Sequence, residues 1–219
     1  MRLTPRLQCI ADMIRRGSSV ADIGSDHAHL PIYLAENNIC RRAVASDVHL
    51  GPLNSARSNI AAHGLEDVIQ TNLGSGFENI GRYEVDTAVI AGMGGELIAD
   101  ILEAVPQGVN TLILQPMRNI SVCRRAVHKN GFEIVRESLA EENGKIYNII
   151  YAERAHKPPA AWSDFEYELS PLIERNELFF RYINARIKKL EKIIERLKNS
   201  DNAALAEKYG EEIKRLKSL

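Results

Sequence analysis

The sequence lacks the features that mark secreted, membrane-bound and metal-dependent proteins. Among 219 residues it has only three cysteines, Cys9, Cys40 and Cys123, and none belongs to a CxxC pair. This excludes a disulfide-rich scaffold and a cysteine-based zinc site, and favours reduced thiols. No hydrophobic run approaches the length of a membrane span, and residues 1–17 alternate apolar and charged positions, unlike a signal peptide. We therefore expect a cytoplasmic protein with no membrane association and no bound metal.

An excess of positive charge is also missing. The 28 Lys and Arg are balanced by 29 Asp and Glu, giving a formal net charge of -1. No global positive field is available to attract nucleic acid, so any such binding depends on a local patch. The candidate phosphate contacts are Arg15, Arg16, Arg41, Arg42, Arg118, Arg124, Arg125, Lys188, Lys189 and Lys192. For most of them the alternative is a solvated charged face.

Apolar runs of strand length alternate with helical stretches over the first two thirds of the chain. Strands are predicted at 19–23, 43–46, 68–72, 87–91 and 111–114. Helices are predicted at 5–17, 29–37, 51–63, 95–104 and 118–130. Near-continuous apolar strands separated by amphipathic helices indicate a parallel sheet covered on both faces. The fold class is therefore α/β, with a Rossmann-like, doubly wound, mostly parallel sheet.

Two further strands follow without a helix between them. Residues 132–139 and 145–153 are predicted to form an antiparallel hairpin at one edge of the sheet. The Lys-Pro-Pro-Ala-Ala stretch within 156–161 then removes two amide donors and favours an extended path. We place the domain boundary there, with a cofactor-binding domain at 1–157 and a helical domain at 158–219.

The composition of the C-terminal part predicts long helices. Ser163 and Glu166 have the spacing of a capping box, and Pro171 suits a first helical turn. An apolar stripe at Ile183, Ile187, Leu190, Ile194 and Leu197 is interrupted at 199–202 and resumes at Leu205, Tyr209, Ile213 and Leu216. These steps of three and four predict an antiparallel helical hairpin that resembles a coiled coil in a monomer. The alternative is a coiled coil with a second chain.

The end of the first predicted strand carries a glycine between two carboxylates. Gly24 lets the backbone turn tightly beside a ligand, and Asp22 and Asp26 flank it. A dinucleotide enzyme would place a pyrophosphate at such a turn, and these carboxylates would repel it. S-adenosyl-L-methionine has a sulfonium, an ammonium and no phosphate, so it fits better. The missing second and third glycines of GxGxxG also disfavour an NAD-dependent dehydrogenase.

Ligand-binding residue types recur where the other predicted strands end, which is where open α/β sheets bind ligands. Asp47 follows the second strand, where a carboxylate can accept the hydroxyl protons of a ribose, although it could equally cap a helix. Gly74 and Gly76 follow the third strand and Gly92 the fourth, so a ligand approaches the backbone there or the chain simply turns. Gln115 ends the fifth strand and could contact the edge of a base.

Several of these segments together resemble the bacterial tRNA (adenine-22-N1)-methyltransferase family. They are Ala-Asp-Ile-Gly-Ser-Asp-His-Ala-His-Leu-Pro at 21–31, Ala-Gly-Met-Gly-Gly at 91–95, Leu-Gln-Pro at 114–116, Arg-Leu-Gln-Cys-Ile-Ala at 6–11, Gly-Phe-Glu-Ile at 131–134 and Lys-Ile-Tyr at 145–147. The resemblance covers nearly the whole chain. It implies methyl transfer from S-adenosyl-L-methionine to N1 of an adenine in the D-arm region of tRNA.

The residues expected to bind the cofactor are Asp22, Gly24, Ser25, Asp26, His27, Asp47, Val48, Gly74, Ser75, Gly76, Gly92 and Met93. The residues expected beside the target base are Asp26, His29, Met93 and Gln115, and Phe77 is a further ring contact. Two positions depart from the family pattern. His29 stands where Tyr is usual, and Ser75 interrupts a common Gly-Asp-Gly.

The implied chemistry needs no general base, because N1 of a neutral adenine carries a lone pair. Two other functions remain open at this stage. One is methyl transfer to another RNA, a protein or a small molecule, since these reactions share the cofactor site. The other is a non-catalytic adaptor that binds a partner through the helical hairpin. For Asp26, the alternative role is to cap the helix that follows it.

Overall fold

The computed structural model describes residues 1–197 and 202–219, which divide into two compact units, Met1–Leu172 and Ile173–Leu219. The structural division lies beyond residue 157, where the composition of the sequence changes. Residues 158–172 belong to the first unit because the backbone carbonyls of Tyr167 and Glu168 accept hydrogen bonds from Arg124, at 2.7 and 3.1 Å.

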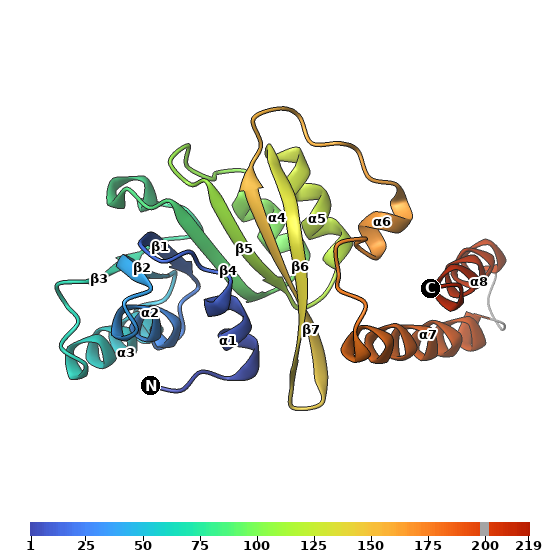
Figure 1. Cartoon of the computed structure of the whole chain (residues 1–219), viewed down its shortest axis with the longest axis horizontal. Coiled ribbons are helices and arrows are strands. Elements are labelled where there is room, and N and C mark those ends of the chain that lie inside the picture. Colours follow the sequence, from blue (N-terminus) through green and yellow to red (C-terminus); the bar gives the residue numbers. More distant parts are fainter. Residues whose placement is uncertain (198–201) are drawn as a thin grey trace. The chain divides into compact units, whose positions relative to one another are not determined.

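The first unit is built on a seven-stranded sheet with the order β3-β2-β1-β4-β5-β7-β6 (Figure 1). The strands are β1 (Ser18–Ile23), β2 (Cys40–Asp47), β3 (Ile69–Leu73), β4 (Thr87–Met93), β5 (Thr111–Pro116), β6 (Phe132–Glu142) and β7 (Lys145–Arg154). The pairs among β1 to β5 are parallel, and the strand order reverses between β1 and β4. The predicted Rossmann-like architecture is confirmed.

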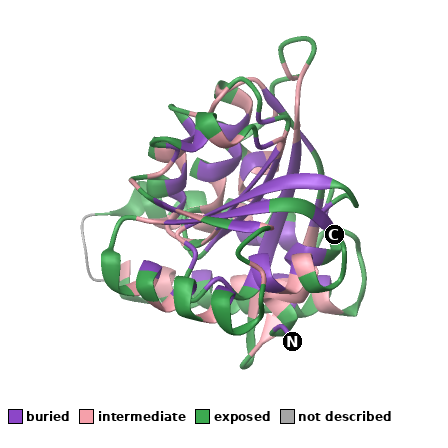
Figure 2. Ribbon diagram, turned by 90° about the vertical axis from the view of Figure 1, so that its left-hand side faces the viewer, coloured by how far each residue is buried: buried purple, intermediate pink, exposed green. Residues whose placement is uncertain are grey.

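The helices of this unit are α1 (Pro5–Asp12), α2 (His29–Glu36), α3 (Leu50–Ala62), α4 (Gly95–Leu102), α5 (Ile120–Lys129), α6 (Asp164–Glu168) and the short 3-10 helix η1 (Ile80–Tyr83). Successive side chains along a strand point to opposite faces of the sheet, so they pack in different layers of helices. Val20 packs with α1 and α2, whereas Ala21 packs in a second cluster with α4 and α5. Figure 2 shows the resulting pattern, with buried residues along the sheet and exposed residues on the outer sides of the helices.

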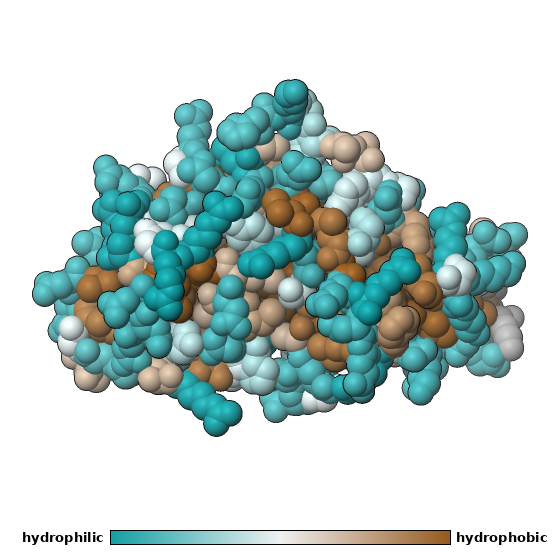
Figure 3. Space-filling view, viewed as in Figure 1, coloured by the Kyte–Doolittle hydropathy of each residue, from teal (hydrophilic) through white to brown (hydrophobic). Residues whose placement is uncertain are grey.

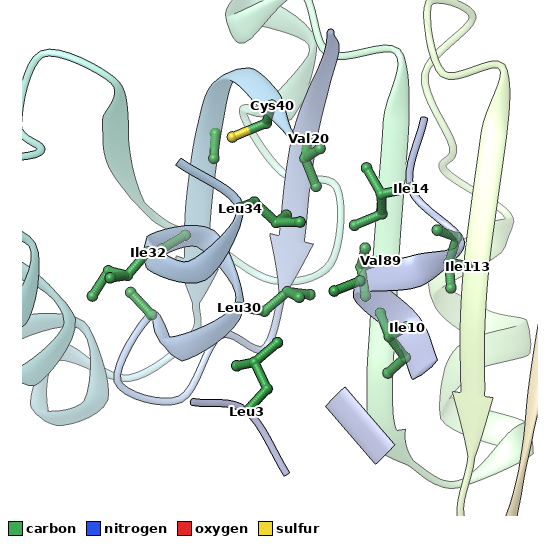
Figure 4. Close-up of a cluster of buried hydrophobic side chains, with 14 of the residues drawn as sticks. Leu3, Ile10, Ile14, Val20, Leu30, Ile32, Leu34, Cys40, Val89 and Ile113 are labelled. Carbon is green, nitrogen blue, oxygen red and sulfur yellow. The ribbon is translucent and has the colours of Figure 1, made fainter. Parts of the chain in front are cut away.

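Helix α1 packs on the face of the sheet to which Val20 points. Its N-cap is Thr4, whose hydroxyl accepts a 3.5 Å hydrogen bond from the Leu7 amide, and Pro5 occupies the first helical position, as predicted. Ile10 is fully buried, and Figure 4 shows it beside Ile113 and Val89 of the sheet. The helix is therefore held by apolar packing against the sheet as well as by its cap.

The predicted edge hairpin is present, and β7 joins it to the sheet by pairing antiparallel with β5. Its tip is a two-residue turn in which Asn143 and Gly144 both have positive φ, 51° and 72°. Asn-Gly suits such a turn because both residues tolerate this conformation. The turn fixes the register of the two strands, including Glu142 opposite Lys145.

Arg124 of α5 forms an ion pair that is completely buried. Its guanidinium donates twice to the carboxylate of Glu137, at 2.8 Å each, and both side chains have no exposed surface. Together with the two carbonyls of α6, Glu137 satisfies the guanidinium, and the pair joins α5, α6 and β6. The expectation that Arg124 contacts a phosphate is therefore wrong, because the side chain cannot be reached from outside.

The second unit consists of α7 (Glu177–Leu197) and α8 (Ala203–Lys217), which pack on each other. The predicted stripe is buried at Ile183, Ile187, Leu190, Ile213 and Leu216 and partly buried at Ile194, Leu197 and Tyr209, whereas Leu205 is exposed. Arg186 and Glu212 add an ion pair between the helices, with a 2.7 Å hydrogen bond. Of the predicted interruption at 199–202, residues 199–201 lie outside the described residues.

The start of α7 differs from the sequence-based expectation. Pro171 lies in a turn, and the helix begins at Glu177. Its first turn is capped by Asn176, whose side-chain oxygen accepts a 3.1 Å hydrogen bond from the Phe179 amide. Asn is a favoured capping residue, so this second start signal overrides the preference of the proline. The capping box of Ser163 and Glu166 is confirmed at α6.

Among the helices of residues 1–197 and 202–219, none combines the length and the apolar character needed to cross a membrane. The same residues contain no group of three or more His, Cys, Asp or Glu side chains placed to hold a metal ion. Polar and charged side chains cover most of the face shown in Figure 3.

Arg124→Met should destabilise the fold by about 3–5 kcal/mol, because Glu137 would be left buried without its partner. Urea unfolding measures this change. Lys129→Met is the matched control on the same helix, since the side chains of Lys129 and Glu103 are 71% and 62% exposed, and its urea midpoint should stay close to that of the wild type. Equal midpoints for the two variants would contradict the importance of the buried pair.

Candidate active site

The polar residues singled out from the sequence gather at the carboxyl edge of the parallel strands. The strand order reverses between β1 and β4, which leaves a crevice beyond their ends in folds of this type. The turns after β1, β2, β3 and β4 all open onto this edge, because parallel strands end on the same side. The structure thus brings the predicted cofactor residues to one edge of the sheet.

The turn after β1 depends on Gly24. This residue has φ of 75°, and a Cβ there would overlap the Cε at the end of the Met93 side chain. The amides of Gly24 and Ser25 both donate to the carbonyl of Ser46 at 2.8 Å, which ties the turn to the end of β2. Any larger residue at Gly24 would have to displace Met93. Met93 of β4 therefore lies directly against the β1 turn.

Asp22, the last polar residue of β1, is buried with 8% of its surface exposed. Burial raises the pKa of its carboxyl group to about 6, and the neighbouring Ser25 side chain acts in the opposite direction. A carboxylate in this position is poorly solvated, so a cationic ligand group would stabilise its charged form.

The turn continues through two residues in a left-handed conformation. His27 and Ala28 have φ of 58° and 55°, which is uncommon for residues other than glycine. The Asn59 side chain of α3 donates to the His27 carbonyl at 3.0 Å and helps to hold this shape. Such backbone geometry is frequent where a protein contacts a ligand.

Asp26 does not cap α2. The N-cap is Ala28, and no side chain makes the capping hydrogen bond there. The Asp26 carboxylate is instead exposed and lies 3.2 Å from Nε2 of His27. The rings of His27 and His29 stack with their centroids 5.6 Å apart, and both residues are exposed. The three side chains therefore form an accessible polar group at the mouth of the turn.

Asp47 at the end of β2 is only 14% exposed. One carboxylate oxygen accepts a 2.7 Å hydrogen bond from the His49 amide, at the N-cap of α3, so part of its role is to order the start of this helix. Val48, between the two, is 51% exposed and apolar. The Gly74 amide donates to the Asp47 carbonyl at 3.1 Å, so the ends of β2 and β3 are joined.

The packing and backbone conformation after β3 explain why Gly74 and Gly76 are glycines. A Cβ on Gly74 would lie 3.0 Å from the Glu78 carbonyl, and Gly76 has φ of 53° and faces Ile101 of α4. Ser75 is exposed, and its amide donates to the Glu78 carboxylate at 3.1 Å. Close packing at Gly74 and the positive φ of Gly76 therefore account for both glycines, and Ser75 is the exposed residue of this turn.

Sequence reasoning missed Asn72. Its buried side chain donates to Ser46 of β2 and to the Glu78 carbonyl, at 3.0 Å each. It therefore fixes the β3 turn against β2. The available signal was an Asn at the end of the strand predicted at 68–72, since an amide that becomes buried needs partners. Phe77, expected beside the target base, is 6% exposed and belongs to the hydrophobic core instead.

Gln115 is fully buried at the end of β5. Its side-chain oxygen accepts hydrogen bonds from Arg6 at 2.8 Å and from the Gly92 amide at 3.2 Å. Its nitrogen donates to the Pro116 carbonyl at 3.1 Å. The amide is thus occupied inside the protein. Arg6 was not expected here from the residue pattern, and the only signal was its place in the segment at 6–11.

The predicted phosphate contacts divide between the two edges of the sheet. Arg15 and Arg16 precede β1, and Arg41 and Arg42 lie at the start of β2, where both donate to Ser19. They lie at the amino edge, about 20 Å from the site for a six-residue strand. These four residues are therefore not part of the site at the carboxyl edge.

Two members of the predicted set remain in the first unit. Arg125 pairs with Asp164 at 2.6 Å and lies over the Tyr167 ring. Arg118 follows β5 and is exposed beside Gly94, so it lies at the carboxyl edge itself. Lys188, Lys189 and Lys192 are exposed on α7 of the second unit.

The carboxylates around the β1 turn suit a cationic nucleoside. Asp22, Asp26 and Asp47 contribute three carboxylates, while the segments 22–29 and 46–50 contain no Lys or Arg. A phosphate would meet negative charge here, whereas a sulfonium and an ammonium would meet complementary charge. The turn residues therefore fit S-adenosyl-L-methionine better than a dinucleotide.

Comparison with known proteins agrees with a site that fits S-adenosyl-L-methionine. The sequence pattern of the methyltransferase domain family matches residues 3–150. The tRNA (adenine(22)-N(1))-methyltransferase of Bacillus subtilis is 34% identical over 99% of this chain and 93% of its own length. A putative tRNA (m1A22) methyltransferase from Streptococcus pneumoniae, solved with S-adenosyl-L-methionine, is 33% identical with a TM-score of 0.88, and 99% of each chain is covered.

M. capricolum TrmK, solved with S-adenosyl-homocysteine, also has a TM-score of 0.88, at 28% identity over 100% of this chain and 97% of its own. These similarities extend over both units rather than over the sheet alone. From the identity to the Bacillus subtilis enzyme along the full length, and from the matched methyltransferase domain, it follows that this chain belongs to the tRNA (adenine(22)-N(1))-methyltransferase family.

Proposed function

We propose that the protein transfers the methyl group of S-adenosyl-L-methionine to N1 of adenine 22 in tRNA. The observation that carries this proposal is the group of three carboxylates, Asp22, Asp26 and Asp47, at the turns after β1 and β2, with no cationic side chain in those turns. The membership of the family and the cofactors named for its solved structures support the same conclusion.

The cofactor residues have separate tasks in this proposal. Asp22 faces the ammonium group of the methionine part, because it is the buried carboxylate closest to the Gly24 turn. Asp47 accepts from the ribose with the oxygen that His49 does not use, and exposed Val48 covers the adenine ring. The full proposed set is Asp22, Gly24, Ser25, Asp26, His27, Asp47, Val48, Gly74, Ser75, Gly76, Gly92 and Met93.

Asp26, His29 and Met93 remain the proposed neighbours of the target base, because Asp26 and His29 are exposed and Met93 is half-buried at the same edge. Gln115 is assigned to the same group through the Gly92 amide that it holds, since its own amide is buried. In folded tRNA the N1 edge can be engaged in pairing or stacking, so we propose that the base swings out toward these residues.

The chain needs to position reactants rather than remove a proton. Bound S-adenosyl-L-methionine supplies a methyl group already activated by its sulfonium. Adenine N1 attacks with a lone pair that is free in the neutral base, so none of these residues has to act as a general base. The exposed carboxylate of Asp26 favours the positive charge that develops on the methylated adenine, and holding the two groups in line supplies much of the remaining acceleration.

We further propose that Arg118 and the lysines of α7 contact tRNA phosphates. Arg118 is exposed at the edge where the base must enter, and the three lysines are solvent-facing on one helix. The N-terminal domain at 1–157 would then hold the cofactor while the part at 158–219 helps to grip RNA. We expect the protein to act as a monomer in the cytoplasm.

The proposal is tested by methylation of tRNA that lacks the endogenous modification. Purified protein and methyl-labelled S-adenosyl-L-methionine should label this tRNA, and mapping of the modified base should identify N1 of adenine 22. Asp47→Ala should reduce labelling by weakening cofactor binding. Labelling of ribonuclease-treated extract would instead indicate a protein or small-molecule substrate, and no labelling of any acceptor would indicate an adaptor.

Cofactor binding should weaken at low pH because of Asp22. Its carboxyl group has a pKa of about 6, so it is mostly protonated at pH 5 and mostly ionised at pH 7. Pairing with a cation requires the ionised form, so calorimetry should show binding about tenfold weaker at pH 5. In the free protein the sign is opposite, because ionising a buried carboxyl costs stability as the pH rises from 3.8 through 6.

The control for this experiment is Asp22→Asn, which cannot ionise and should bind the cofactor weakly at both pH values. A pH dependence that persists unchanged in Asp22→Asn would come from other groups and would remove the role assigned to Asp22.

Replacing Lys188, Lys189 and Lys192 together with Ala should weaken tRNA binding at fixed salt. The slope of log K against log salt should become shallower by about 0.9 for each lysine that contacts a phosphate. Arg16→Ala with Arg41→Ala is the matched control at the amino edge and should leave the slope unchanged. If all variants kept the wild-type slope, α7 would not be a phosphate-binding surface.

A further inference from the structure

Arg6 makes an unexpected connection between α1 and the end of β5. One guanidinium nitrogen donates to the side-chain oxygen of Gln115 at 2.8 Å. The same oxygen accepts from the Gly92 amide of β4 at 3.2 Å. Both partners are donors, so the amide of Gln115 can take only one orientation, with its nitrogen toward the Pro116 carbonyl.

Gly92 lies where the pairing of β4 with β5 is irregular. The register shifts between Ala91 and Met93, and Gly92 has φ of 79°. The bulge comes directly before Met93, whose Cε lies against Gly24. The Gln115 oxygen therefore holds the amide of the bulge residue, next to a side chain that lies against the β1 turn.

Arg6 is itself held from several sides. Its own amide donates to the Glu142 carboxylate at 3.2 Å, and its Nε lies 3.9 Å from the same carboxylate. Its guanidinium lies over the Tyr147 ring, 5.7 Å from the centroid. These contacts come from the tips of β6 and β7, so α1, the hairpin and the Gln115 side chain meet at one guanidinium. A planar group with several donors suits this role better than a lysine.

We infer that Arg6 is a positioning residue for methyl transfer: through Gln115 it fixes the Gly92-Met93 bulge against the Gly24 turn. This role rests on the proposed function, because Gly92 and Met93 belong to the proposed cofactor set and Met93 is also a proposed neighbour of the target base. Arg6 touches neither reactant. Its loss should therefore change the alignment of the two reactants more than the binding of either one.

Arg6→Met tests this role because it keeps the length and apolar stem of the side chain and removes its donors. We expect kcat to fall by about tenfold to a hundredfold, the size of effect that a small misplacement of reactants produces. The Kd of S-adenosyl-homocysteine and the KM for tRNA should stay within about threefold of the wild type. Arg6→Lys should recover part of kcat, since one donor can still reach Gln115.

Arg2→Met is the matched control, an exposed arginine shortly before α1, and should behave as the wild type. An amide resonance of Gly92 that shifts in Arg6→Met but not in Arg2→Met would report the loosened bulge directly. Parallel losses of kcat, cofactor affinity and thermal stability would show a merely structural role and overturn the inference, as would an unchanged kcat. A wild-type protein that methylates no tRNA would instead refute the proposed function.

Discussion

A carboxyl group withdrawn from water at the end of β1 is the constraint around which this site is arranged. Asp22 is 8% exposed, and burial raises its pKa to about 6. Leaving a charge in such a place is costly unless a ligand compensates for it. Gly24 beside it has φ of 75°, a conformation that residues with a Cβ rarely adopt, so the turn itself requires glycine. The same two residues thus combine a buried charge with a tight backbone turn at the end of one strand.

The fold itself was largely predictable, because its signals are local and repeated. Alternation along β1 places Val20 and Ala21 in opposite layers, and both layers must then be covered by helices. The Thr4 cap and the capping box at Ser163 also act over a few residues. The helix start predicted at Pro171 was wrong because Asn176 caps the helix instead. Two candidate start residues lie close together in the sequence, and their spacing alone does not show which one is used.

The site was predictable only in part, because partners far apart in the sequence decide what a side chain can do. The positions of Asp22 and Gly24 follow from the end of one strand. The burial of Arg124 depends on Glu137, and that of Gln115 on Arg6, 109 residues away. Likewise, Arg41 looks like any surface cation in the sequence, and only the strand direction places it at the edge opposite the site.

The distribution of charge explains how one enzyme can bind a cation and a polyanion. The acidic turns after β1 and β2 attract the cofactor and repel the RNA backbone, so phosphates must be held elsewhere. Arg118 at the rim and the lysines of α7 are exposed and suited to this, although the net charge is only -1. A base that swings out carries no phosphate charge into the pocket, so the acidic site is compatible with RNA only if the base enters and the backbone stays outside.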